Sequence, residues 1–267
     1  MPREVTAFSN PTVKRLRSLR DKKARKEEGL FLAEGLRIIA EARDSGRLPE
    51  TIMFSAEGAR HPLALDIIAA TEAAGGDAIE TTADILSKTS GKDNPQMLVA
   101  AYKQPETGLS AIDRSIAPLW FAAQALRDPG NIGTILRTGD AVGAGGLILI
   151  DDSADPYSVE AVRASMGAIF TQKVAKASWQ EFVGWLRSGP GQLVGTSLKA
   201  TEDYLDVQYQ PPSFLLIGNE QQGLPPAYED QCDVLVKIPM AGRADSLNAA
   251  IAAAVMAFQV KASWRRA

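Results

Sequence analysis

The sequence predicts two successive α/β units, the second of which contains a mainly parallel sheet. Within residues 119–267, five short apolar runs alternate with segments of helical periodicity. This alternation is typical of a parallel sheet covered on both faces. Shorter runs and helices alternate within residues 1–105, and residues 106–118 lie in a stretch of linker-like composition. A length of 267 residues suits two domains.

The first unit, residues 1–105, is expected to hold four short strands. The first begins at Leu30. The other three cover Thr51–Phe54, Asp77–Glu80 and Met97–Tyr102. Helical spacing of apolar residues predicts three helices. One begins near Leu36, and the others cover Leu63–Ala74 and Ile85–Lys88. Gly and Pro residues mark the ends of several of these segments, as expected for turns.

The second unit, residues 119–267, is expected to hold five strands and four helices. The predicted strands are Leu119–Leu126, Leu147–Ile150, Gln192–Thr196, Phe214–Ile217 and Val234–Ile238. The predicted helices lie near Ile132–Val142, Val159–Phe170, Trp179–Arg187 and Leu247–Val260. No internal repeat or low-complexity tract interrupts this order.

Composition excludes several classes of protein. Apolar residues make up 45% of the chain and charged residues 23%, which is typical of a globular protein. No apolar run approaches the roughly 18 residues needed to span a bilayer. The N-terminus lacks the apolar core of a signal peptide. We therefore expect a cytoplasmic protein without a membrane partner.

Cysteine and histidine each occur once, as Cys232 and His61. This excludes an intramolecular disulfide, a CxxC redox pair and a cysteine-based zinc cluster. Catalysis by histidine would have to use His61, which follows Arg60 in a turn-like segment, and we expect it to play no such role. Cys232 has no neighbouring histidine or second cysteine to activate it, so we interpret it as a buried thiol. No bound metal is expected.

Positive charge is concentrated near the N-terminus, in a chain whose net charge is −3. Residues 11–26 contain one anion, Asp21, and eight cations: Lys14, Arg15, Arg17, Arg20, Lys22, Lys23, Arg25 and Lys26. One interpretation is a solvated helix face. The other is an arm that binds a polyanion such as RNA, with Lys14, Arg15, Arg17 and Arg20 as candidate contacts. Val13, Leu16 and Leu19 recur every three residues, so this face should pack while the cations point outward.

Three polar loops follow predicted strands of the second unit, where ligands bind in sheets of this type. The first, Arg127–Arg137, contains Asn131 and Arg137, six residues apart on the predicted helix. These two side chains are candidates to face a common ligand, although a capped turn followed by a surface arginine explains them equally well.

The second loop, Gly218–Pro225, has the G-x-x-x-x-G outline of a phosphate-binding loop. Leu224 stands where that motif requires lysine, so nucleoside triphosphate binding is not expected. The G-x-G-x-x-G pattern of dinucleotide enzymes is also absent. A glycine-rich loop that bears Glu220 suits a ligand held by backbone groups.

The third loop, Met240–Asn248, precedes an alanine-rich helix. Asp245 or Ser246 is expected to cap that helix. Ser246 and Asn248 would then lie near its positive N-terminal end. Capping alone does not explain why three polar loops are expected at one edge of the sheet.

Taken together, these loops resemble the three motifs of the SpoU (TrmH-like) RNA ribose 2′-O-methyltransferases of the SPOUT class. The matching stretches are Asn131-x-Gly133-x-x-x-Arg137, Gly218-Asn219-Glu220-x-x-Gly223 and Ser246-Leu247-Asn248-x-x-x-Ala252, with Arg163–Ala168 between the first two. The resemblance covers residues from Leu119 to about Val260. Residues 31–35 and 94–96 resemble the ribosomal-protein-like α/β substrate-binding domain that is often fused to this family.

This resemblance implies a SPOUT-type α/β trefoil knot, S-adenosylmethionine as the methyl donor, and a homodimer with each active site completed near the partner's surface. It implies that backbone groups around Thr196, Gly218, Ile238 and Leu247 hold the donor. The family assigns proton removal from the ribose 2′-hydroxyl to the arginine that matches Arg137. A guanidinium is a poor general base, so we expect Arg137 to polarise the hydroxyl and to fix the adjacent phosphate.

The other motif residues have expected supporting roles. Asn131 and Glu220 would orient the arginine or the hydroxyl, and Ser246 and Asn248 would position the ribose or the amino-acid part of the donor. The substrate is expected to be ribosomal RNA. Alternatives are a transfer RNA ribose methyltransferase, a non-catalytic RNA-binding module on the same fold, and a small-molecule methyltransferase or nucleotide enzyme.

Overall fold

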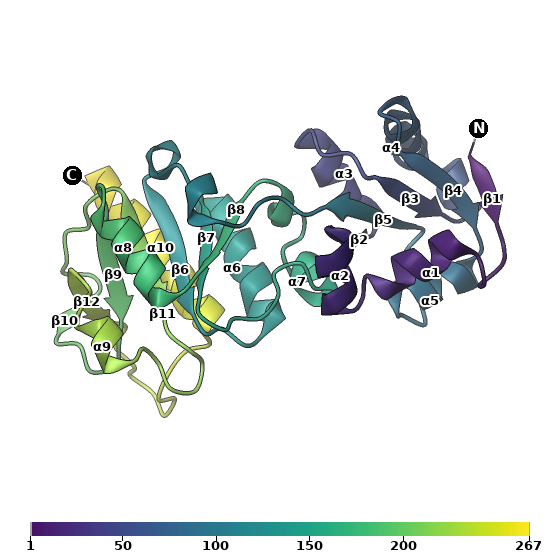
Figure 1. Ribbon diagram of the computed structural model, residues 1–267. Helices are drawn as coiled ribbons and strands as arrows, with labels where there is room; N and C mark the ends of the chain where they lie inside the picture. The colour runs from purple at the N-terminus through teal and green to yellow at the C-terminus, as the bar shows by residue number, and fades with distance from the viewer. Residues whose placement is uncertain (1, 267) are drawn as a thin grey trace. The chain divides into compact units, whose positions relative to one another are not determined.

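The computed structural model describes residues 2–266, which form two compact units. The first comprises the chain up to Pro105 together with the later segment Asp155–Thr171, and the second comprises Glu106–Ala154 and the chain from Gln172 onward. Each unit is a sheet covered by helices (Figure 1). The predicted fold class, α/β with a mainly parallel C-terminal sheet, is confirmed.

The first unit contains a mixed five-stranded sheet. Its strand order is β1 (Arg3–Val5), β4 (Asp77–Thr81), β3 (Thr51–Phe54), β5 (Leu98–Lys103) and β2 (Leu30–Glu34). Strand β5 runs antiparallel to both of its neighbours, whereas β1, β3 and β4 are parallel. The larger helices on this sheet are α3 (Leu36–Asp44), α4 (Pro62–Ala73) and α5 (Ala83–Ser90). Strand β1 was not predicted, because its three residues are too few to show an alternation of apolar and polar side chains.

The basic segment forms two helices, α1 (Pro11–Ser18) and α2 (Lys22–Glu28). The Asp21 carboxylate accepts a hydrogen bond from the Lys23 amide at 2.7 Å and so starts the second helix. Val13, Leu16 and Leu19 are fully buried in the core of this unit, which confirms the predicted packing face. Most cations of the segment are exposed as expected, but Arg25 is buried.

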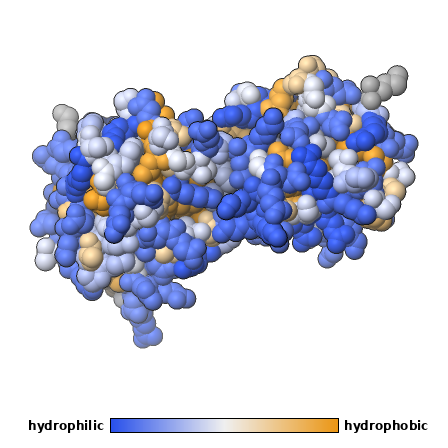
Figure 2. All heavy atoms as spheres, in the orientation of Figure 1, coloured by the Kyte–Doolittle hydropathy of each residue, from blue (hydrophilic) through white to orange (hydrophobic). Residues whose placement is uncertain are grey.

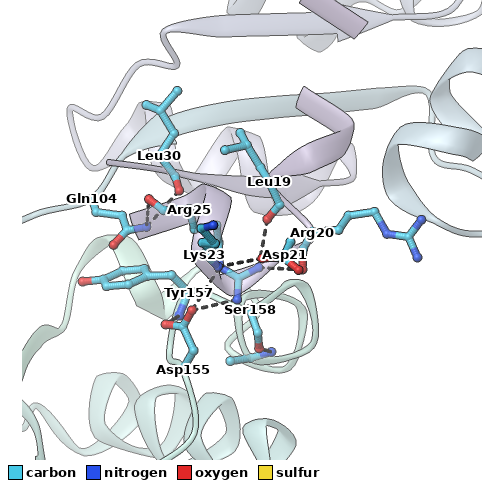
Figure 3. Close-up of polar contacts among 11 residues, drawn as sticks. Leu19, Arg20, Asp21, Lys23, Arg25, Leu30, Gln104, Asp155, Tyr157 and Ser158 are labelled. Carbon is cyan, nitrogen blue, oxygen red and sulfur yellow. Dashed lines mark hydrogen bonds and ion pairs between the residues drawn. The ribbon is translucent and has the colours of Figure 1, made fainter. Parts of the chain in front are cut away.

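Arg25 joins the basic segment to the segment that begins at Asp155 (Figure 3). Its Nε and Nη2 atoms donate to Asp155 Oδ2 at 3.0 and 2.7 Å. Its Nη1 donates to the backbone carbonyls of Leu19 and Arg20 at 2.9 and 2.8 Å. The Arg25 side chain is only 5% exposed and that of Asp155 10%. This arginine therefore has a structural role, and its charge is not offered to solvent.

Replacement of Arg25 with methionine should destabilise the first unit by about 3–5 kcal/mol, because Asp155 and two carbonyls would stay buried without their donor. Urea unfolding of the full chain measures this loss. Lys22→Met on the same helix is the control: this lysine is exposed, so its replacement should change stability by less than about 0.5 kcal/mol. Equal effects of the two replacements would show that the buried ion pair contributes nothing.

The segment Asp155–Thr171 packs on β2, although about 120 residues of chain separate them. It contains α7 (Val159–Ala164) and the 3-10 turn η4 (Ala168–Phe170). Between them Met166 and Gly167 have φ values of 51° and 103°, in the left-handed region, so the continuous helix predicted over 159–170 is wrong. Strand β2 is buried on both faces, and this segment supplies the cover on one of them.

The second unit is built on a seven-stranded sheet in which every neighbouring pair is parallel. The strand order is β10 (Glu202–Asp203), β12 (Val234–Lys237), β9 (Gln192–Thr196), β11 (Ser213–Ile217), β6 (Leu119–Gln124), β7 (Gly146–Ile150) and β8 (Lys173–Ala177). The predicted strands are present, and the two edge strands β8 and β10 were missed. The trefoil knot stays a prediction.

Helices cover both faces of this sheet (Figure 1). On one face α8 (Trp179–Arg187) packs over Trp120, Phe214 and the other apolar side chains of the same core cluster. On the opposite face α6 (Pro129–Val142) and α10 (Ala249–Arg266) contact the strands and lie side by side. The short helix α9 (Pro226–Glu229) precedes β12.

The outer surface is mostly hydrophilic on the face shown in Figure 2, with apolar residues in small patches. Among residues 2–266, no helix combines the length and the apolar character that crossing a bilayer would need.

Candidate functional site

The candidate site lies beyond the carboxyl ends of four strands of the second unit. Strands β12, β9, β11 and β6 are consecutive neighbours in the sheet. Because all four are parallel, the loops that follow them emerge at the same edge. Three of these loops carry the motif residues singled out in the sequence. The order of strands in the sheet, which differs from their order in the chain, is what brings the loops together.

A pocket of about 260 Å³ lies among these loops. All four predicted donor-binding residues line it: Thr196, Gly218, Ile238 and Leu247. Glu220 and Ser246 line it as well. Its wall combines apolar side chains with the backbone of the Gly218–Leu224 loop, an arrangement suited to a ligand with a flat apolar part and polar edges.

Three of the predicted catalytic residues form a hydrogen-bonded chain beside this pocket. Asn131 Nδ2 donates to Glu220 Oε1 at 2.9 Å, and Asn248 Nδ2 donates to Asn131 Oδ1 at 3.0 Å. Asn131, in the first turn of α6, is only 6% exposed, whereas Glu220 and Asn248 are exposed. These hydrogen bonds therefore link all three motifs through the buried side-chain amide of Asn131.

The hydrogen bonds also set the direction of each amide. An ionised carboxylate only accepts hydrogen bonds, so Asn131 must turn its NH₂ group toward Glu220 and its oxygen toward Asn248. Asn248 Oδ1 in turn accepts from the backbone N–H groups of Ala250 and Ile251 at 2.9 and 3.3 Å. Helix α10 thus begins at Ala249 and is capped by Asn248. The prediction that Asp245 or Ser246 caps this helix is wrong.

The loop after β11 folds tightly back on its own strand. A Cβ atom on Gly218 would lie 2.4 Å from the carbonyl carbon of Gly223 and 2.6 Å from the Leu224 amide nitrogen. Asn219 Nδ2 donates to the Ala125 carbonyl at 2.8 Å and so ties this loop to the end of β6. Glycine at position 218 is therefore required by close approach of backbone to backbone.

Arg137 is not brought into this group of side chains. It lies on α6 and is exposed, and its side chain makes no hydrogen bond or ion pair with another residue in the range 2–266. Six residues along an α-helix correspond to a rotation of about 240°. Asn131 therefore points into the protein while Arg137 points away from it. Within one chain the two side chains do not face a common point.

Two further pocket residues, Ser197 and Glu229, were not predicted from the sequence. Ser197 follows β9, Glu229 lies on α9, and both line the pocket. The Ser197 hydroxyl donates to Glu229 Oε1 at 2.6 Å. Neither residue belongs to a motif, and only the folded chain brings them together. A carboxylate at this position places negative charge in the wall of the pocket.

The two rare residues take no part in this site. Cys232 is half-buried, and burial raises the pKa of its thiol to about 12. It therefore stays protonated at neutral pH, which agrees with the interpretation of an inert thiol. His61 lies in the other unit, immediately before α4. Across residues 2–266, no cluster of three or more His, Cys, Asp or Glu side chains is arranged to hold a metal ion.

Comparison with known proteins identifies the family. The profile of the SpoU rRNA Methylase family matches residues 118–258, more than half of the chain. The chain belongs to this family. Residues 10–100 match the MRM3-like substrate binding domain. The suspected resemblance to SpoU (TrmH-like) methyltransferases is thus confirmed.

Relatives of this SpoU protein cover nearly its whole length. A 23S rRNA uridine 2′-O-methyltransferase from Streptomyces viridochromogenes is 33% identical over 90% of this chain and 85% of its own. A 23S rRNA guanosine 2′-O-methyltransferase from Bacillus subtilis is 27% identical over 97% and 99%. The crystal structure of an AdoMet-bound rRNA methyltransferase from Sinorhizobium meliloti aligns with a TM-score of 0.90 and 40% identity over 97% of each chain.

Proposed function

We propose that this SpoU protein transfers a methyl group from S-adenosylmethionine to a ribose 2′-hydroxyl of ribosomal RNA. The observation that carries the proposal is the hydrogen-bonded series Glu220–Asn131–Asn248, which joins the three family motifs beside one pocket. The names of the relatives, two of them 23S rRNA 2′-O-methyltransferases, support both the reaction and the class of RNA.

The residues of the pocket fit the proposed donor. Leu247 and Ile238 offer apolar surface for an adenine ring, and the backbone of the Gly218–Leu224 loop, which lines the same pocket, would present N–H and C=O groups to its polar edge. Glu229 and Glu220 place carboxylates in the wall, which suits a ligand with a sulfonium and an ammonium group. When bound, S-adenosylmethionine supplies an electrophilic methyl group.

The protein then has to orient the ribose hydroxyl and assist loss of its proton. Alignment of two reactants accounts for a large part of such a rate enhancement. Asn131, held between Glu220 and Asn248, is preorganised to direct a hydrogen bond or to fix the Glu220 carboxylate. Arg137, with five donors and a permanent charge, would stabilise the developing alkoxide and hold the adjacent phosphate. Ser246, at the pocket wall, would contact the donor or the ribose.

Incubation with radiolabelled S-adenosylmethionine and unmodified 23S rRNA transcript tests the reaction directly. We expect label in the RNA and, after nuclease digestion, a nucleoside methylated on the ribose by mass spectrometry. A transfer RNA transcript serves as the comparison. Label on a base, or label in transfer RNA alone, would contradict the proposal. Binding of RNA without any transfer would favour the alternative of a non-catalytic RNA-binding module.

Arg137 is exposed on α6 in a single chain, so we place it in the site through a homodimer. Helix α10, which packs beside α6, exposes Ile251 and Phe258 by 53% and 58%. Seven residues apart, they lie on one face of the helix, and exposed apolar side chains on one stripe are typical of an interface. A second copy covering this stripe would carry its own Arg137 close to the first copy's pocket. Light scattering should give twice the monomer mass of 28.5 kDa.

The basic segment supports the proposed RNA substrate and is the part expected to bind phosphates. Of the four candidate residues, Lys14, Arg17 and Arg20 are exposed. Arg15 instead donates to Glu28 Oε2 at 2.8 Å and to Glu50 Oε1 at 2.9 Å. These bonds raise the pKa of Arg15, and they occupy the guanidinium. Arg15 is therefore the weakest of the four candidates for an RNA contact.

Neutralising Lys14, Arg17 and Arg20 together should reduce the slope of log affinity for RNA against log salt by about 2, since each phosphate contact to a single strand contributes roughly 0.7. Fluorescence anisotropy with a labelled rRNA fragment at several salt concentrations measures the slope. Arg15→Gln is the matched control and should leave the slope nearly unchanged. An unchanged slope in the triple variant would mean that this segment is only a solvated face.

A cytoplasmic location fits an enzyme of ribosomal RNA and stays a prediction.

A further inference from the structure

A second cavity, of about 600 Å³, lies in the first unit. None of the predicted catalytic or donor-binding residues lines it, although Arg163 and Met166 belong to the stretch Arg163–Ala168 that resembles the family pattern. The cavity opens where β2 ends and α3 begins. Its walls come from three parts of the chain: residues 34–44, the loop that holds Lys92 and Gln96, and the segment with Arg163 and Met166. All of these parts belong to the same compact unit. Nothing in the methyl-transfer chemistry uses this cavity.

The centre of the cavity wall is a buried carboxylate with incomplete hydrogen bonding. The Glu34 side chain is 5% exposed, with Oε2 3.2 Å from Arg163 Nη2 and Oε1 3.3 Å from Lys92 Nζ. Oε1 nevertheless accepts no hydrogen bond, and Arg163 Nε donates none, within the part of the chain that is described. A buried acceptor and a buried donor left unsatisfied side by side are uncommon in native proteins and require an explanation.

A purely structural role explains only half of this arrangement. The bond from Arg163 to Glu34 Oε2 fastens α7 to β2, as the Arg25–Asp155 pair does elsewhere in the unit. It does not give Arg163 Nε a hydrogen-bond acceptor, and Oε1 keeps only its ion pair with Lys92. Met166, another lining residue, is held at φ 51°, a backbone conformation that costs about 1–2 kcal/mol for a residue other than glycine. Such strain often accompanies a ligand site.

The chemistry of these atoms selects among the groups that RNA presents. A phosphate carries only acceptors at neutral pH and would be repelled by Glu34. A base that donates hydrogen bonds satisfies the carboxylate, and a neighbouring carbonyl on the same edge satisfies a cation. Guanine alone offers two adjacent donors, N1–H and the N2 amino group, beside the O6 acceptor. Uracil has one donor between two carbonyls, cytosine a single amino group beside two acceptors, and adenine no carbonyl.

We propose that this cavity receives a guanine base from a single-stranded segment of the RNA substrate. Glu34 would accept from N1–H and N2–H, while Arg163 and Lys92 would donate to O6. The Lys92 side chain is 33% exposed, so it can move from Oε1 to the base. Unpaired RNA bases are commonly read in this way on their Watson–Crick edge. The site would be a sequence-reading contact apart from the nucleotide that is methylated, and it rests on the proposed RNA substrate.

Removal of a single amino group from the RNA base tests the proposal on the unaltered protein. Labelled ten-nucleotide oligouridylates that carry one central guanosine, inosine or adenosine are titrated with the full-length protein. Fluorescence anisotropy measures the affinity for each. Inosine lacks only the N2 amino group. We expect the guanosine oligomer to bind about tenfold more tightly than the inosine one, the value of one hydrogen bond to a charged group. Equal affinities for the two would overturn the proposal.

Two variants locate the discrimination. Glu34→Gln removes the charge that favours two donors, and the guanosine-to-inosine ratio should fall to about twofold or less. Asp44→Asn removes an exposed carboxylate from the same cavity and should leave the ratio unchanged. A ratio that survives in Glu34→Gln would place the discrimination elsewhere and overturn the proposal. Melting curves and donor calorimetry check that each variant is folded.

The outcomes for this site and for the proposed function are distinguishable. Methyl transfer to rRNA together with equal binding of the guanosine and inosine oligomers would refute the guanine site alone. Failure to bind any oligomer, with no transfer to rRNA, would refute the RNA substrate and the guanine site with it.

Discussion

Replacement of Arg137 with alanine is expected to lower kcat for RNA methylation by about 10²–10³-fold while donor affinity stays unchanged. This is the usual loss when a donor aimed at a developing negative charge is removed. Arg137 has no partner among residues 2–266 that would explain it as a structural residue. The measurements are single-turnover transfer from labelled donor to rRNA and calorimetry with the donor alone. A variant that methylates at the normal rate would refute the assigned role.

The neighbouring substitution Thr134→Ala is the control, since Thr134 is exposed on α6 and bonds only to the Gly130 carbonyl. It should retain nearly full activity. Arg137→Lys keeps the charge but not the forked geometry, so it should recover only part of the rate.

Mixed dimers test whether Arg137 acts across the interface. The Arg137→Ala chain keeps an intact donor pocket. The Gly218→Ala chain, whose donor pocket is impaired, keeps an intact Arg137. When the two impaired variants are mixed at a donor concentration too low to saturate the altered pocket, a heterodimer would join the intact pocket of one chain to the intact arginine of the other. We expect activity to return in the mixture. No recovery, with heterodimers demonstrated by differential tagging, would mean that Arg137 serves the pocket of its own chain.

Gly218→Ala is expected to lower donor affinity by about 10- to 100-fold, or about 1.4–2.8 kcal/mol. The added methyl would lie 2.4 Å from the carbonyl carbon of Gly223, so the loop must shift away from β11. That shift would move Glu220 and widen the pocket. Calorimetry with S-adenosylmethionine measures the loss, and circular dichroism shows whether the sheet is retained.

Gly184→Ala is the matched control for this glycine replacement. Gly184 lies within α8, and a Cβ atom there would meet no other atom within 4 Å. This replacement should leave donor affinity unchanged and add about 0.5–1 kcal/mol of stability, as expected when glycine in a helix becomes alanine. Normal donor binding by Gly218→Ala would show that the loop tolerates displacement and that the pocket lies elsewhere.

Local patterns in the sequence were sufficient to predict most elements and the place of the site. Buried parallel strands require nearly continuous apolar runs, and Leu147–Ile150 and Phe214–Ile217 show them clearly. Polar loops after such strands stand out because their neighbours are apolar. The edge strand β8 (Lys173–Ala177) was not predicted because two of its five residues are lysines, so it lacks the continuous apolar run of the buried strands. The cap of α10 was predicted two or three residues too early because Asp245, Ser246 and Asn248 all have capping side chains.

The amino-acid order by itself determined the α/β class, the three polar loops that meet at the pocket and the resemblance to SpoU enzymes, because these depend on periodicity and residue type at short range. Tertiary structure alone decided the rest. It buries Arg25 against Asp155, leaves Arg137 outside the group of motif side chains, and packs α7 on β2 within the first unit. The reason is physical: the pairing of buried charges and the cover of a strand that is apolar on both faces depend on residues more than a hundred positions away.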